Sequence, residues 1–227
     1  MNSSFRSMKT FLTRGSLAAV AVVAAGCLFL SACGPPTGYK QADKTGEGIA
    51  QFHDEIVNLK KNVDETLHGM SEIELTADTD ARKAFEKFSR SVNELADAAD
   101  KAQKRGAAIK ADGEAYFLHW EQQLAEVQNP EIKRLAEVRK AKLRAAFDGI
   151  KRTAVPLREQ FTPWLSDLKD LQTYLSNDLS IGGVDAARSQ FAKSKAGGAE
   201  VVKSIDALVA ELNSILAALA PVKGERR

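Results

Sequence analysis

The stretch FEKFSRSVNEL, residues 85–95, decides the fold, because Phe85, Phe88, Val92 and Leu95 recur at every third or fourth position. That spacing places the four apolar side chains on one face of an α-helix. The repeat continues almost unbroken along the chain, and its further positions are Ala99, Ala102, Gly106, Ile109, Gly113, Tyr116, Trp120, Leu124 and Val127. A seven-residue repeat of this length is typical of a coiled-coil seam, so we expect one long helix over residues 81–128.

Three other segments have apolar positions with helical spacing, namely residues 43–71, 131–177 and 184–219. Turn and cap formers separate the segments at Thr76–Asp80, Asn129–Pro130 and Asp178–Gly183. No alternating strand pattern occurs. The short connections make neighbouring helices antiparallel, so the predicted fold is all-α: an elongated antiparallel bundle of four long helices with coiled-coil-like seams.

The predicted helices differ in length. The second spans about 48 residues and the first about 29, so the second should extend roughly 28 Å further at 1.5 Å per residue. The excess lies at the end where the first helix begins. We therefore expect the hairpin around Asn129 to project beyond the bundle at that end.

The N-terminal region has the pattern of a secretion signal. Arg6, Lys9 and Arg14 precede an apolar run, residues 17–30, that is too short to span a bilayer comfortably. The sequence Leu30-Ser31-Ala32-Cys33 follows and resembles the lipobox of bacterial lipoproteins. We divide the chain into four parts: residues 1–32 as signal peptide, 33–42 as flexible lipidated tether, 43–220 as a single helical-bundle domain and 221–227 as a basic tail.

The resemblance implies cleavage before Cys33 and attachment of diacylglyceryl and a further fatty acyl group such as palmitate to that residue. Several acyl chains anchor a protein stably where one does not. Gly34 takes the place of the Asp that is associated with inner-membrane retention, which implies the outer membrane, facing the periplasm, in a host that has one. Ala24–Cys27 is a weaker competing box, because cleavage there would truncate the apolar run.

Charge and cysteine content exclude several function classes. Without residues 1–32 the chain has 29 basic and 30 acidic side chains, so no general attraction to nucleic acid is expected. Cys33 is then the only cysteine, which excludes an intramolecular disulfide and a thiolate metal cluster.

Basic side chains are concentrated after the predicted hairpin turn, at Lys133, Arg134, Arg139, Lys140, Lys142 and Arg144. They are candidates for contact with anionic lipid headgroups or with a cell-wall polymer. Charged runs are more often solvated helix faces paired with acids on other helices, and that alternative stays open.

No motif for catalysis or cofactor binding is present, and we expect no enzyme, cofactor or metal. The histidines are His53, His68 and His119. Glu65 and His68 have the spacing of a di-iron ligand pair, but no second copy of that motif occurs. The aromatic residues allow either a ligand pocket between helices or, more often, a core; they are Tyr116, Phe117, Trp120, Phe161, Trp164 and Tyr174.

Two stretches carry a resemblance to a known family. They are Ala115-Tyr116-Phe117 with Trp120-Glu121, and residues 161–168, FTPWLSDL, leading to residues 174–179, YLSNDL. Over roughly residues 39–219 the chain resembles a bacterial family of domains of unknown function, whose members are secreted, helical and often lipidated. The resemblance implies fold and compartment and no activity.

These features favour a non-enzymatic interaction or scaffold protein of the cell envelope, held on the membrane by its lipid, with a protein partner or a second copy along its seams. Two alternatives are membrane-surface binding or shaping through the basic hairpin, and carriage of an apolar small molecule.

Overall fold

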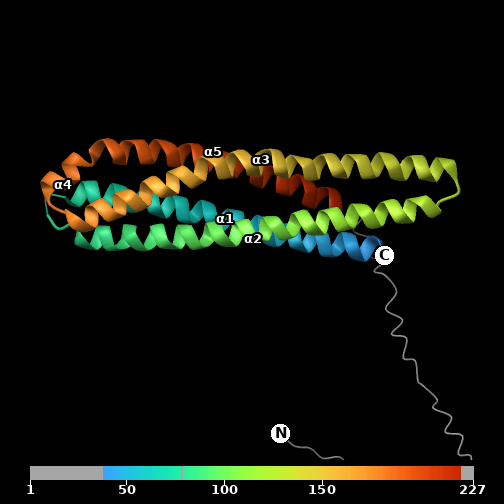
Figure 1. Ribbon diagram of the computed structural model, residues 1–227, viewed down its shortest axis with the longest axis horizontal. Coiled ribbons are helices and arrows are strands. Elements are labelled where there is room, and N and C mark those ends of the chain that lie inside the picture. The colour runs from blue at the N-terminus through green and yellow to red at the C-terminus, as the bar shows by residue number, and fades with distance from the viewer. Residues whose placement is uncertain (1–37, 78, 221–227) are drawn as a thin grey trace, which may run out of the picture. The chain divides into compact units, whose positions relative to one another are not determined.

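The computed structural model describes residues 38–77 and 79–220; the predicted signal peptide, Cys33 and the basic tail lie outside them. Within the described ranges the chain forms helices and no strands. The helices are α1 (Gly38–Thr76), α2 (Arg82–Glu126), α3 (Pro130–Asn177), α4 (Ile181–Ala186) and α5 (Arg188–Leu219). The predicted all-α antiparallel bundle is confirmed (Figure 1).

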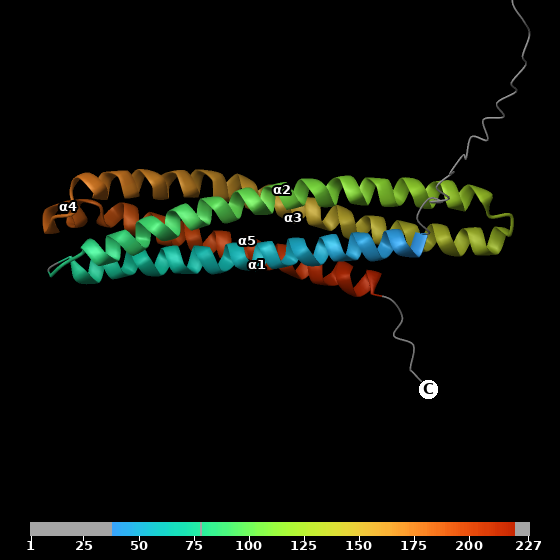
Figure 2. The ribbon, with the colours of Figure 1, turned by 90° about the horizontal axis from the view of Figure 1, so that it is seen from below.

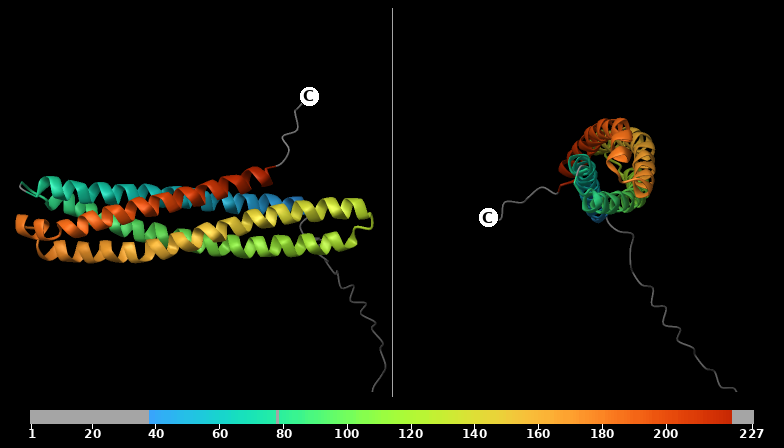
Figure 3. Two further views of the ribbon diagram at one scale, coloured as in Figure 1. Left: turned by 90° about the horizontal axis from the view of Figure 1, so that it is seen from above. Right: turned by 90° about the vertical axis from the view of Figure 1, so that its left-hand side faces the viewer.

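The four long helices surround one core. α1 packs on α2 and α5, and α3 packs on α5 and α2, so the helices form a closed ring around the bundle axis (Figure 3, right). The apolar positions of the predicted seams fill the interior, with Phe88, Leu95, Leu168 and Phe191 fully buried. The seams therefore close within one chain.

Small residues set the distance between α1 and α2. Gly69 lies against Phe88, whose Cα would be 3.1 Å from a Cβ built on the glycine. Ala84, Ala98 and Ala102 are buried on the facing side of α2. Small side chains allow two helix backbones to approach closely, and these two helices make the most extensive contact in the bundle.

Helix boundaries follow the predicted caps at two places. Asn129 caps α3, because its Oδ1 accepts hydrogen bonds from the backbone N–H groups of Glu131 (2.9 Å) and Ile132 (3.2 Å), and Pro130 takes the first helical position. Ser180 caps α4 by accepting from the N–H of Gly183 at 3.1 Å. The chain then continues after a one-residue break at Ala187 into α5, so the predicted fourth helix is two helices.

α1 is longer than predicted at both ends. It begins at Gly38 rather than Asp43, so residues 38–42 of the predicted tether are helical. Ala42 packs against the aromatic side chains of α2, which gives these residues a surface to fold on. At the other end the helix continues past Ser71 to Thr76 because Ile73 is fully buried.

The longer α1 reduces the expected overhang of the hairpin. α1 has 39 residues and α2 has 45, a difference of about 9 Å rather than 28 Å. The direction is as predicted: the α2–α3 turn lies at the end where α1 begins and projects beyond both α1 and α5 (Figure 2). α5 ends earliest, since it has 32 residues against 48 in α3.

Candidate interaction surface

A second, smaller core lies at the base of the projecting α2–α3 hairpin, where Ala42 of α1 and Ala218 and Leu219 of α5 pack against it. Tyr116 and Phe117 of α2 pack with the buried Leu143 of α3 and with Phe147. The rings meet edge to face, with centroid distances of 5.4 Å for Tyr116–Phe117 and 5.3 Å for Phe117–Phe147. Gly113 makes room for this packing, because a Cβ there would lie 2.8 Å from the Phe147 ring. This core therefore holds α2 and α3 together at the base of the hairpin, next to the ends of α1 and α5.

Three of the six predicted basic contact residues are engaged inside the chain. Arg144 lies over the Phe117 ring at 5.0 Å from its centroid, a cation–π arrangement. Lys140 pairs with Glu121 of α2 at 3.3 Å. Arg139 donates a hydrogen bond to the backbone oxygen of Ala218 and so caps the last turn of α5. These three side chains stabilise the hairpin and are not free for a partner.

The other three predicted residues are available. Arg134 and Lys142 are exposed and Lys133 is half-buried. None of them takes part in the ion pairs formed between residues that the structure describes. Lys133 and Arg134 lie at the start of α3, next to the turn and beside Glu131 and Glu137, and Lys142 lies more than two turns further along the helix.

The same stretch of α3 exposes aliphatic side chains. Ile132 is 55%, Leu135 59% and Val138 47% exposed, at a spacing of three residues along α3. We call residues 124–138 the hairpin tip and these three side chains its apolar stripe. The stripe has no covering helix because α5 ends at Leu219, where its last turn meets Arg139, and α1 begins at Gly38, beside Gln123.

Sequence reasoning missed this stripe. Ile132 and Leu135 are among the apolar positions with helical spacing in residues 131–177, and that spacing alone favours a buried seam. The signal that would have found them is the short final helix, which cannot reach the first turns of α3. The pattern of a seam identifies the face of a helix, whereas burial also requires a neighbour at the same height.

The histidines lie in separate places. His68 pairs with Glu72 at 2.9 Å, while Glu65, which is three residues before it, is close to Lys61 at 3.5 Å. The hydrogen bond from Lys87, at 3.0 Å, and the nearby positive charges of Lys87 and His68 lower the pKa of Glu72. Among the described residues no three His, Cys, Asp or Glu side chains are grouped so that they could hold a metal ion.

The six aromatic candidates do not form one pocket. Tyr116, Phe117 and Trp120 belong to the hairpin core. Phe161 and Trp164 are buried in the main core, where the indole Nε1 donates to the Ser194 carbonyl at 2.7 Å. Tyr174 is 40% exposed near α4, and its hydroxyl donates to the Gly183 carbonyl at 3.1 Å.

Hollows on the surface of the described helices include a cleft and a groove. A cleft of about 220 Å³ lies between the start of α1 and α2, and it is lined by Gly38, Tyr39, Ala42, Tyr116, His119, Trp120 and Gln123. The Nε2 atom of His119 is buried there without a hydrogen-bond partner in the described chain, and burial raises the pKa of Tyr116. An open groove of about 730 Å³ follows α1 and α2 further along, and its walls are mostly charged.

Fold and surface together define a long helical bundle with a projecting two-helix tip. The chain belongs to the family described as "Protein of unknown function (DUF2959)", whose model matches residues 37–219. No curated protein and no solved structure matches the chain. None of the described helices is long and apolar enough to cross a membrane.

Proposed function

We propose that the protein is a lipid-anchored, non-enzymatic interaction module of the cell envelope. In this proposal residues 1–32 are removed, Cys33 carries the lipid, and the bundle stands on the periplasmic face of the outer membrane. The observation that carries the interaction role is the apolar stripe of the hairpin tip, which leaves Ile132, Leu135 and Val138 about half exposed. Exposed apolar groups rimmed by polar ones mark interaction sites.

The anchor is supported by the order of features at the N-terminus. A basic segment, an apolar run and Leu30-Ser31-Ala32-Cys33 follow one another as lipidation requires. Sulfur is the strongest nucleophile in that stretch, and the small residues before it fit an enzyme site. The bundle then begins at Gly38, five residues after the anchor.

Fatty acid labelling in the native host tests the anchor. Cells fed an alkyne fatty acid should label the natural chain, and the label should disappear in Cys33→Ser. The matched control is Cys27→Ser, the other cysteine of the chain, which should keep full labelling. Labelling that is lost in Cys27→Ser and kept in Cys33→Ser would overturn this assignment.

The non-enzymatic role has a separate test. Turnover of any envelope substrate by the purified protein would overturn it.

Carriage of an apolar small molecule is the second candidate, and the cleft beside His119 is the observation that favours it. Its volume of about 220 Å³ is below the range of roughly 300–1,000 Å³ typical of small-molecule sites. A ligand that co-purifies in native mass spectra and is lost in Trp120→Ala would support this function over the interaction role.

A further inference from the structure

We infer that the hairpin tip is a second membrane contact: its apolar stripe enters the headgroup–acyl boundary of an anionic bilayer, and Lys133 and Arg134 of the tip, with Lys142 one turn of α3 behind it, bind the headgroups. The orientation of the bundle relative to the membrane rests on the proposed function. The chemistry of the contact rests on the exposed side chains of the hairpin tip. The sequence offers six basic residues for such a contact. The proposed surface is smaller and consists of three aliphatic and three basic side chains.

The first step is the lack of any cover over the stripe. Arg139 marks the height at which α5 ends, because its guanidinium reaches the Ala218 carbonyl. Ile132 and Leu135 lie one to two turns closer to the α2–α3 turn than Arg139. A partner from outside the described bundle is therefore required to remove these side chains from water.

The second step is the charge beside the stripe. Residues 124–142 contain five basic and three acidic side chains. Lys140 and Arg139 are used within the chain, which leaves three basic side chains beside the three acidic ones. Of these, Lys133 and Arg134 lie between Ile132 and Leu135 of the stripe, and Lys142 follows one turn after Val138. Aliphatic groups between lysine and arginine side chains are the composition of helices that lie in the interface of anionic membranes.

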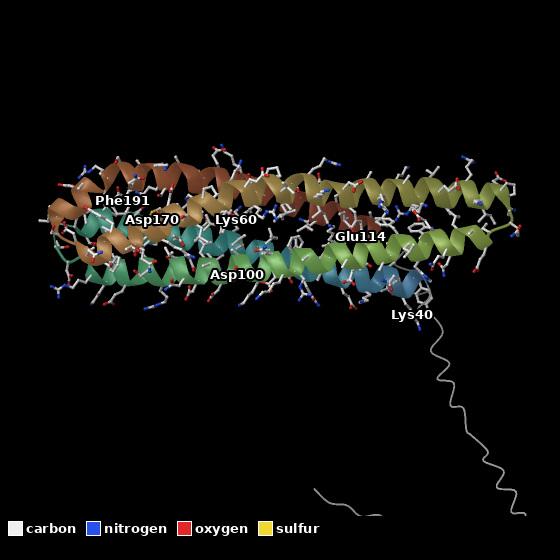
Figure 4. The ribbon with its side chains drawn as sticks, viewed as in Figure 1. Lys40, Lys60, Asp100, Glu114, Asp170 and Phe191 are labelled. Carbon is white, nitrogen blue, oxygen red and sulfur yellow. The ribbon has the colours of Figure 1, made fainter. Side chains whose placement is uncertain are left out.

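The third step is the position of the tip. The tip lies at the end where α1 begins, and Cys33 precedes Gly38 by five residues, a reach of up to about 17 Å. Tyr39, 66% exposed, is at the same end, and Lys40 next to it marks the start of α1 in Figure 4. Tyrosine is enriched at membrane–water interfaces. A lipid on Cys33 would hold this end of the bundle close to the bilayer.

A second copy of the chain is the other occupant that the stripe allows. A stable protein interface buries at least about 1,000 Å² in total, and the three half-exposed aliphatic side chains supply only a small part of that. The membrane is therefore the better match, and self-association becomes an outcome of the test.

The experiment uses residues 34–227, because the described helices, residues 38–77 and 79–220, close around one core of their own. This protein is mixed with vesicles of phosphatidylcholine containing 30% phosphatidylglycerol, at 50 mM and 500 mM NaCl, and sedimented. We expect binding at low salt that falls at high salt, and little binding to pure phosphatidylcholine. Each aliphatic side chain that inserts fully should contribute about tenfold to partitioning.

Two triple variants separate the two parts of the surface. Ile132→Ser/Leu135→Ser/Val138→Ser should reduce binding at both salt concentrations by a hundredfold or more. Lys133→Glu/Arg134→Glu/Lys142→Glu should remove the salt-dependent part. The matched controls are Leu75→Ser/Ile181→Ser, at the opposite end and 83% and 51% exposed, and Lys101→Glu/Lys104→Glu on the middle of α2; both should bind as the parent does. Circular dichroism confirms that each variant is folded.

A fluorescent probe then shows which end contacts the lipid. Residues 34–227 contain no cysteine, so one introduced cysteine gives a unique label. An environment-sensitive dye on Leu135→Cys should shift to the blue with anionic vesicles, and the same dye on Leu75→Cys should not. Equal shifts at both positions, or no binding at either salt, would overturn the inference. A dimer in sedimentation velocity that Ile132→Ser/Leu135→Ser dissociates would overturn it in favour of a second copy.

Failure here is distinguishable from failure of the proposed function. If the tip does not bind vesicles but Cys33 is labelled in cells, the lipid is the sole anchor and the proposed function stands. If the tip binds vesicles but Cys33 is not labelled, the membrane contact stands without the anchor.

Discussion

The two ends of the bundle are built from the same kind of apolar repeat and differ in how much of it is buried. At the end that carries α4, Phe88 and Phe191 are fully buried, and Val184 of α4 is 4% exposed (Figure 1, left). At the hairpin end Ile132 and Leu135 are more than half exposed. The first end has four long helices and α4 around it, whereas only α2 and α3 reach the hairpin tip.

The comparison shows that helix length decides burial as much as sequence pattern does. Ion pairs between different helices also favour the covered part: Lys60 of α1 meets Asp206 of α5 at 2.5 Å, and Lys193 of α5 meets Asp167 of α3 at 2.9 Å. In the part of the chain that the structure describes, no residue of the hairpin tip forms such an ion pair. The end with α4 should therefore carry the stability of the bundle, and the tip should be free for another role.

The largest expected effect is the loss of an aromatic ring from the covered end. Phe88→Ala should lower the free energy of unfolding by about 3–5 kcal/mol, because it leaves a cavity in a fully packed site. Leu135→Ala, the matched change at the tip, should alter it by less than about 0.5 kcal/mol. Urea denaturation of residues 34–227 measures both. A loss of more than about 2 kcal/mol in Leu135→Ala would mean that the tip is packed in solution.

A pair of glycines gives the second test, because the same substitution should have opposite signs. Gly69→Ala should destabilise the bundle by about 1–3 kcal/mol, since its Cβ would meet the backbone of Phe88 at 3.1 Å and push α1 from α2. Gly46→Ala has open space and should stabilise by about 0.5–1 kcal/mol, because alanine is the better helix former. Thermal unfolding of the two variants distinguishes the signs, and a stabilising Gly69→Ala would contradict the close approach.

Much of the fold follows from the sequence, since helix spacing and end signals are local properties of the chain. The cap at Asn129 and the glycine-containing break before α5 lie where the sequence places them. The predicted start of α1 at residue 43 is five residues too late. Residues 38–42 are helical because Ala42 contacts aromatic side chains of α2. That contact joins residues about 75 positions apart, and no local pattern contains it.

The candidate surface could be predicted only in part, for the same reason. The concentration of positive charge after Asn129 is visible in the sequence, but which charges are free depends on other helices. Arg144 lies over Phe117, and Arg139 reaches the end of α5. Both partners come from elements distant in sequence.

A smaller effect is expected from the two helix caps. Asn129→Ala removes the acceptor of two backbone N–H groups and should cost about 1 kcal/mol locally. Because the tip can open without exposing the main core, the loss should appear as faster hydrogen exchange at Glu131 and Ile132 and not in the global unfolding curve. Ser180→Ala, the matched cap, starts a helix whose Val184 is buried, so its effect of about 1 kcal/mol should appear in global unfolding. Equal behaviour of the two variants would mean that the ends unfold together.

The smallest effect is a change of titration at the covered end. The Ser180 hydroxyl, at 2.6 Å, and the Ser180 backbone N–H, at 3.2 Å, lower the pKa of Asp178 from its ordinary value of 3.8, because both stabilise the carboxylate. A carboxyl whose pKa is lower in the folded state stabilises the fold above about pH 4, and this contribution disappears as the pH falls through the folded pKa.

Ser180→Ala should raise the pKa of Asp178 towards 3.8, and Ser180→Thr, which keeps the hydroxyl, should leave it low. An NMR titration of the carboxyl carbon measures the shift. If the pKa stays low in Ser180→Ala, the backbone N–H alone holds the carboxylate, and the side chain of Ser180 serves only as the cap of α4.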